Sequence, residues 1–161
     1  MKNTILILSL VLFSSVFTFA QKKKKDAAPA PVEIKADQAR TKNFLLKTSR
    51  FTGHSQRAVY NTKGYTGNLG QMVRYQREAK RLYEAGNYQQ AIYFSRRARL
   101  FGHEALKANK AIATSDGKFS AEEETLSTGM PSDTELEKSI SAVPMVTDES
   151  LMKGNLEVDI K

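Results

Sequence analysis

Residues 71–113 have the clearest periodicity in the chain and read QMVRYQREAKRLYEAGNYQQAIYFSRRARLFGHEALKANKAIA. The first half repeats apolar residues at steps of three and four, at Met72, Tyr75, Ala79 and Leu82. Residues at these steps share one face of a helix. Gly86-Asn87 then interrupts the pattern, because glycine permits the left-handed end of a helix and asparagine is a preferred N-cap. The segment therefore predicts two antiparallel helices joined by a short turn.

The second half of this segment carries a stripe of mainly small residues at the same steps: Tyr88, Ala91, Ser95, Ala98, Gly102, Ala105, Asn109 and Ile112. Small side chains allow two helix backbones to approach closely, so we expect Ala91, Ser95, Ala98 and Gly102 to face the first helix. The expected packing seam consists of Tyr75, Ala79, Leu82, Ala91, Ser95 and Ala98. Larger neighbours such as Tyr93 and Phe101 need cover, either from the segment before the hairpin or from a second copy of the chain.

The stretch from Tyr75 to Ala98 resembles one helical hairpin of the tetratricopeptide repeat family. Tyr75 falls at the aromatic first position of the repeat, Ala79 at its small position, and Ala91 and Ala98 at the packing alanines of the second helix. The resemblance covers 24 residues and a single repeat, and no proline closes the unit. It implies a helical hairpin used as a binding scaffold. An ordinary amphipathic hairpin with alanine-rich packing is the alternative.

A third helix is expected upstream, from Ala36 to Phe51, with Asp37 in its first turn and Thr52-Gly53 at its end. Residues 55–61 fit either another short helix or an irregular strand. Glycines at positions 64, 67 and 70 indicate a loop that leads into the hairpin. The predicted fold class is therefore all-α, a small helical hairpin or three-helix arrangement over residues 36–113.

The N-terminal residues 1–20 have the layout of a secretory signal, with Lys2 before an apolar run and Ala20 at the expected cleavage position. This predicts an exported protein, periplasmic or secreted. An uncleaved membrane anchor is the alternative, although the run from Ile5 to Phe19 is shorter than the ~20 residues that span a bilayer. Residues 21–35 contain four consecutive lysines and an Ala-Pro repeat, which is typical of an extended linker.

The C-terminal residues 114–161 differ in composition from the rest of the chain. Residues 115–161 contain eleven Asp and Glu, four Lys and one aromatic residue, Phe119. Such a composition is typical of a segment that buries too little surface to fold, so we expect a disordered acidic tail. Ser120-Ala-Glu-Glu has the form of a capping box and predicts one short helix. Residues 155–161 alternate polar and apolar residues, which fits a strand added to another protein's sheet or a disordered terminus.

Charge is divided unevenly along the chain, whose formal net charge is +8. Residues 32–114 carry sixteen Lys and Arg against five acids, whereas residues 115–161 carry a net −7. This division suggests an anionic partner, docking of the tail on the basic core, or a purely solubilising surface. The candidate anion- or partner-binding residues lie on the two hairpin helices: Arg74, Arg77, Lys80, Arg81, Arg96, Arg97 and Arg99.

Catalytic, metal and cofactor sites find no support in the sequence. There are no cysteines, and the two histidines, His54 and His103, lack partners at ligand spacing. The glycine-rich loop at 64–70 is not a phosphate-binding motif, although a helix N-terminus there can attract an anion. The leading hypothesis is an exported, non-catalytic helical adaptor that binds another envelope protein; a homo-oligomer is a further option. The alternative is a basic binder of anionic polymer or lipid head groups, since export argues against nucleic acid.

Overall fold

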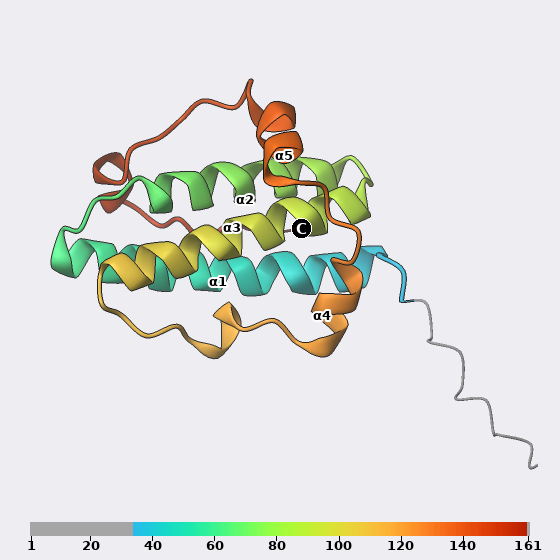
Figure 1. Cartoon of the computed structure of the whole chain (residues 1–161), viewed down its shortest axis with the longest axis horizontal. Coiled ribbons are helices and arrows are strands. Elements are labelled where there is room, and N and C mark those ends of the chain that lie inside the picture. The colour runs from blue at the N-terminus through green and yellow to red at the C-terminus, as the bar shows by residue number, and fades with distance from the viewer. Residues whose placement is uncertain (1–33, 161) are drawn as a thin grey trace, which may run out of the picture. The chain divides into compact units, whose positions relative to one another are not determined.

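Three long helices packed side by side form the centre of the molecule (Figure 1). The computed structural model describes residues 34–160, so the predicted signal and most of the linker lie outside the described residues. Helix α1 spans Gln38–Thr62, α2 spans Asn68–Glu84 and α3 spans Tyr88–Ala108. Two shorter helices, α4 (Ala121–Leu126) and α5 (Asp133–Ile140), follow with the 3₁₀ turns η1 (Ser115–Gly117) and η2 (Glu149–Met152). The described part of the chain is all-α and has no strand, which confirms the predicted fold class.

The hairpin of α2 and α3 turns where the sequence predicts. Gly86 adopts the left-handed conformation, with φ +78°, and the backbone N–H of Asn87 donates to the Leu82 carbonyl at 2.9 Å. Asn87 occupies the N-cap position of α3, but its side chain makes no capping hydrogen bond. The turn therefore depends on the backbone freedom of Gly86 more than on the asparagine side chain.

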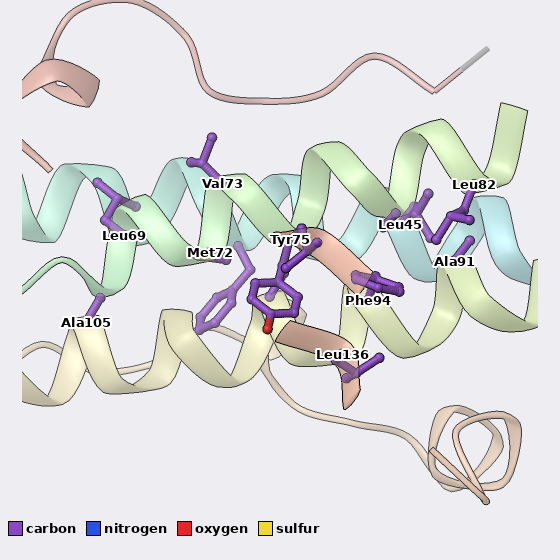
Figure 2. Packing of buried hydrophobic residues seen from close by; sticks show 14 of the residues in the cluster. Leu45, Leu69, Met72, Val73, Tyr75, Leu82, Ala91, Phe94, Ala105 and Leu136 are labelled. Atoms are coloured by element: carbon purple, nitrogen blue, oxygen red, sulfur yellow. The ribbon is translucent and has the colours of Figure 1, made fainter. Parts of the chain in front are cut away.

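The six predicted seam residues are all buried: Tyr75, Ala79, Leu82, Ala91, Ser95 and Ala98. The Tyr75 ring lies 5.8 Å from the ring of Phe94 and 5.4 Å from that of Phe101, measured between centroids. Figure 2 shows Leu82 and Ala91 near the turn of the hairpin and Tyr75 farther along it. Small residues on α3 let the helices approach, and the aromatic rings fill the space beside them.

Helix α1 is longer than predicted, because it continues through Gly53 and takes in residues 55–61. The expectation of a helix end at Thr52-Gly53 is wrong. A Cβ atom at position 53 would lie 2.9 Å from a carboxylate oxygen of Glu157, so the glycine admits the C-terminal segment close to the helix. The helix ends at Thr62, and its C-cap, Lys63, is left-handed with φ +58°. A glycine within a helix costs only about 1 kcal/mol, and packing can compensate for it.

Helix α3 ends at Ala108, earlier than the predicted boundary at residue 113. Asn109 caps the end from a buried position, and Lys110 turns the chain with φ +52°. Ile112 therefore lies beyond the helix and is 87% exposed, although it is the last residue of the predicted helical stripe.

The expectation of a disordered tail is wrong. Residues 115–160, here called the C-terminal arm, pack on the three-helix bundle and form one compact unit with residues 34–114. Five apolar side chains of the arm are buried: Leu126, Leu136, Ile140, Leu151 and Ile160. The composition of the arm did not predict its folding, because these buried residues are few and each packs against side chains of the three-helix bundle.

The last described residues, 155–160, have no regular secondary structure and do not form a strand. The Ser49 hydroxyl on α1 donates to the Val158 carbonyl at 3.2 Å, and the Val158 N–H donates to the Ser49 hydroxyl at 2.5 Å. The segment therefore binds to polar groups of α1 and not to a sheet edge.

Candidate partner-binding surface

The seven predicted basic residues do not form one open cationic face. Arg74 and Arg99 are buried, with 3% and 0% of their surface exposed. Ion pairs hold six of the seven: Arg74–Glu137, Lys80–Glu84, Arg81–Glu78, Arg96–Glu124, Arg97–Asp133 and Arg99–Glu123. Four of these acids come from the C-terminal arm. Arg77 is exposed and has no ion pair among the described residues.

Arg99 is the centre of a buried polar network between α1, α3 and α4. Its guanidinium donates to Glu123 Oε1 at 3.1 and 3.2 Å, to the Thr48 hydroxyl and to the Phe44 carbonyl at 3.2 Å. The Ser95 hydroxyl continues the network by donating to the Thr48 hydroxyl at 2.8 Å. Such a network specifies one arrangement of helices, because each buried polar group needs its partner.

Arg99 and Glu123 each oppose the effect that burial has on the pKa of the other. Burial lowers the pKa of Arg99, and the hydrogen bond and charge of Glu123 oppose that shift. Burial raises the pKa of Glu123, but hydrogen bonds from the Ser120 backbone and from Arg99 outweigh it, so the pKa lies below its ordinary value. Arg99 therefore anchors α4 and is not accessible to an external anion.

Helix α5 lies on the α2–α3 hairpin, and Arg74 holds it with all three guanidinium nitrogens. Arg74 Nη1 donates to Glu137 Oε1 at 2.6 Å, Nη2 to the Ile140 carbonyl at 2.8 Å, and Nε to the Val143 carbonyl at 2.9 Å. The first contact neutralises an acid of α5, and in the other two the guanidinium donates to carbonyl oxygens at and beyond the C-terminal end of α5. A guanidinium suits this role because its donors form a planar fork.

Tyr75 and Arg97 complete the polar contacts with α5. The Tyr75 hydroxyl donates to Glu137 Oε2 at 2.8 Å, and Arg97 pairs with Asp133 at 2.8 Å. Burial and the Glu137 carboxylate together raise the pKa of Tyr75 to about 12. The hydrogen bonds from Arg74 and Tyr75 hold the pKa of Glu137 below its ordinary value. Both acids on this face of α5 thus meet a cation of the hairpin.

Apolar contact supports these ion pairs. Leu136 and Ile140 of α5 are buried against the hairpin, and Figure 2 shows Leu136 beside Tyr75 and Phe94. A groove runs along each side of α5. One, of about 520 Å³, is lined by Tyr75, Phe101 and α5 residues. The other, of about 320 Å³, is lined by Leu82, Phe94 and Leu136. We call the surface formed by Arg74, Tyr75, Phe94 and Arg97 the helix-binding surface.

The remaining candidates lie away from this surface or at its rim. Arg81 is exposed and bound to Glu78 of its own helix, and Lys80 reaches Glu84 one turn later. Arg96 pairs with Glu124 and stacks on the Phe119 ring, whose centroid is 4.2 Å away. These contacts fix side chains locally and leave Arg77 as the one candidate outside any ion pair in residues 34–160.

The glycine-rich loop before α2 does hold an anion, and the anion is the chain's own Asp148. One carboxylate oxygen accepts from the N–H groups of Thr66 and Gly67 at 2.9 and 2.8 Å, and the other accepts from Gly70 at 2.8 Å. A Cβ at position 70 would lie 2.1 Å from the Val146 carbonyl, so this glycine is required for the close approach. The loop is thus an internal cap and not an open phosphate site.

Two of these features escaped the sequence interpretation. Ser132 begins α5 with a capping box to Glu135, and the Ser-x-x-Glu spacing before Leu136 is the signal that would have revealed it. The same signal at Ser120 correctly predicted α4. Asp148 has no comparable local signal, because its partners lie about eighty residues earlier in the chain.

The histidines make structural contacts with carbonyl groups. His54 Nε2 lies 2.8 Å from the Ile112 carbonyl oxygen, and His103 Nε2 lies 2.9 Å from that of Gly117. Within residues 34–160 no three His, Asp or Glu side chains gather as metal ligands, and no helix has the length and apolar character to cross a membrane.

Comparison with known proteins gives no relative from which a role could be transferred. The chain matches no protein-family profile, no curated protein and no solved structure. The function therefore has to be argued from the geometry of the chain.

Proposed function

We propose that the chain is an exported, non-catalytic helical adaptor that binds another envelope protein through its helix-binding surface. The observation that carries the proposal is the docking of α5 on the α2–α3 hairpin. An amphipathic helix that lies on such a surface is a recurrent mode of protein recognition. The resemblance of residues 75–98 to a tetratricopeptide hairpin supports the same role.

The docked helix defines the partner that the surface would accept. Helix α5 presents two acids four residues apart, Asp133 and Glu137, to Arg97 and Arg74. Between and after them it presents the apolar residues Leu136 and Ile140. A partner would offer an acidic amphipathic helix with this spacing and replace α5.

Helix α5 is suited to such an exchange. It has 8 residues, and a helix of that length is marginal without its packing contacts. The partner acids Asp133 and Glu137 are half exposed or more, so solvent screens their ion pairs. The arginine-rich faces offer less support to the alternative of a general anion binder, because six of the seven cations already have acidic partners.

The test releases α5 and measures binding at the surface it leaves. Leu136→Ala with Ile140→Ala removes both apolar anchors, whereas Thr134→Ala with Lys138→Ala changes exposed positions at the same spacing. The first variant should bind a labelled peptide of residues 131–145 and capture a partner from envelope extract that this peptide displaces. The control variant should do neither better than the unaltered chain.

Absence of peptide binding by the released variant would remove the helix-binding surface from the proposal. Capture of a partner that the peptide fails to displace would place the adaptor function elsewhere on the molecule.

A further inference from the structure

Helices α1 and α3 end at the same end of the bundle, where one asparagine joins them. Asn109 Nδ2 donates to the Gly64 carbonyl at 3.0 Å, and the Gly64 N–H donates back to Asn109 Oδ1 at 3.1 Å. The contact between His54 and the Ile112 carbonyl, at 2.8 Å, extends the same junction. Residues 54–67 and 105–115 are therefore neighbours in space, although they are well separated in the sequence.

The two segments that meet here contain no Asp or Glu. They carry four exposed cations, which are Arg57, Lys63, Lys107 and Lys110, and none of these has an ion pair among the described residues. The acids that flank the second segment in the sequence are Glu104, one turn before the end of α3, and Asp116, which pairs with Arg50 of α1. Asp148 of the C-terminal arm reaches this end, but its buried carboxylate binds backbone N–H groups and pairs with none of the four cations. On the α5 side, by contrast, the acids of the arm neutralise the arginines.

Exposed apolar side chains gather at the same end. Of the four large hydrophobic residues that are well exposed in residues 34–160, three belong to these segments: Ile112 at 87%, Tyr60 at 53% and Tyr65 at 36%. The Lys63 ammonium lies 3.9 Å from the centroid of the Tyr60 ring. We call the four cations with Tyr60, Tyr65 and Ile112 the basic end.

We propose that the basic end binds membrane surfaces that contain anionic phospholipids. The cations match the head-group phosphates, and each basic side chain near such a surface contributes about a fivefold gain in affinity. Tyrosine favours the boundary between head groups and acyl chains, because one end of its ring is apolar and the other polar. Ile112 then has an apolar environment that an anionic polymer in water would not provide.

The test uses the chain from Gln21 onward, the form expected after signal cleavage, and sedimentation with vesicles. Changing Lys63, Lys107 and Lys110 to Gln should weaken binding to phosphatidylglycerol-containing vesicles about a hundredfold. The matched control changes Lys42, Lys118 and Lys138 to Gln, which removes the same net charge elsewhere and should cost much less. Neutral phosphatidylcholine vesicles should bind neither the unaltered chain nor the variants. Equal losses in the two triple variants would overturn the proposal, since net charge alone would then explain binding.

A second measurement locates the contact, because the chain contains no tryptophan. In Ile112→Trp the indole emission should shift to the blue on addition of anionic vesicles. In Met145→Trp, at an exposed residue of the C-terminal arm outside the basic end, it should not shift. Heparin binding without any such shift in vesicles would assign the basic end to an anionic polymer and overturn the lipid proposal.

Discussion

The α2–α3 seam and the C-terminal arm bury their apolar residues in different ways. The seam is continuous, since Tyr75, Ala79 and Leu82 on one helix meet small buried residues at regular steps on the other. The arm buries single residues such as Leu126 and Leu151 between exposed stretches, and charged contacts such as Glu123–Arg99 join it to the bundle. The seam can form from local periodicity, whereas the arm needs a finished bundle to dock on.

The largest expected effect comes from the contact that joins the two regions. Glu123→Ala would leave the guanidinium of Arg99 fully buried without its acid, and loss of one partner of a buried pair costs about 3–5 kcal/mol. Urea denaturation followed by circular dichroism measures this change. Glu122→Ala, next to it but half exposed, should cost less than about 1 kcal/mol. Equal losses in the two variants would show that the buried pair has no special role.

Overpacking of the seam should have the next largest effect. Ala98 is fully buried between the helices, so Ala98→Leu should destabilise the protein by about 1–3 kcal/mol. Ala108→Leu adds the same side chain at an exposed position at the end of α3 and serves as the control. If thermal melting of Ala98→Leu matched that of the control, the helices would have room that the seam does not show.

A smaller effect is expected at the internal cap. Asp148→Ala leaves three N–H groups at the start of α2 without their acceptor and should cost about 1 kcal/mol. In this variant the amide hydrogens of Thr66, Gly67 and Gly70 should exchange faster than in the unaltered chain, whereas exchange at the seam amides should change little. Asp159→Ala removes an exposed carboxylate of the same arm and should leave these amides unchanged; protection that persists in Asp148→Ala would contradict the cap.

The smallest expected effect is a loosening of α5 in acid. The Arg74 and Tyr75 hydrogen bonds hold the pKa of Glu137 below its ordinary value of 4.5. Glu137 therefore stabilises the folded state above pH 4.5, and this contribution is lost as the pH falls through its lower folded-state pKa. Because Glu137 is half exposed, the loss should be at most about 1 kcal/mol.

Chemical shifts of the Leu136 and Ile140 amides follow this loosening, with the Ala91 amide as a reference in the seam. In Glu137→Gln these α5 amides should already show the loosened state at neutral pH. Identical acid responses in the variant and the unaltered chain would assign the effect to another carboxylate, such as Glu123.

Local patterns were sufficient for some elements of the fold and insufficient for others. The periodicity from Met72 to Leu82 and the Gly86 turn placed the hairpin correctly, because helix amphipathicity and positive φ are local properties. The same reasoning ended α1 at Gly53, since nothing nearby reveals that Glu157 packs over that glycine. The seven basic residues were grouped by helix face, but their acidic partners lie in other elements or on the same helix and decide which of them stay accessible.

The amino-acid order alone accounts for the all-α class, the seam residues and the capping box at Ser120, because each depends on contacts within a few helical turns. The tertiary structure alone decides that the acidic arm is folded, that Asp148 fills the anion site of the glycine loop, and that four unpaired cations meet at the basic end. Those outcomes depend on side chains tens of residues apart, and their pairing gains energy only after the three helices have brought the sites together.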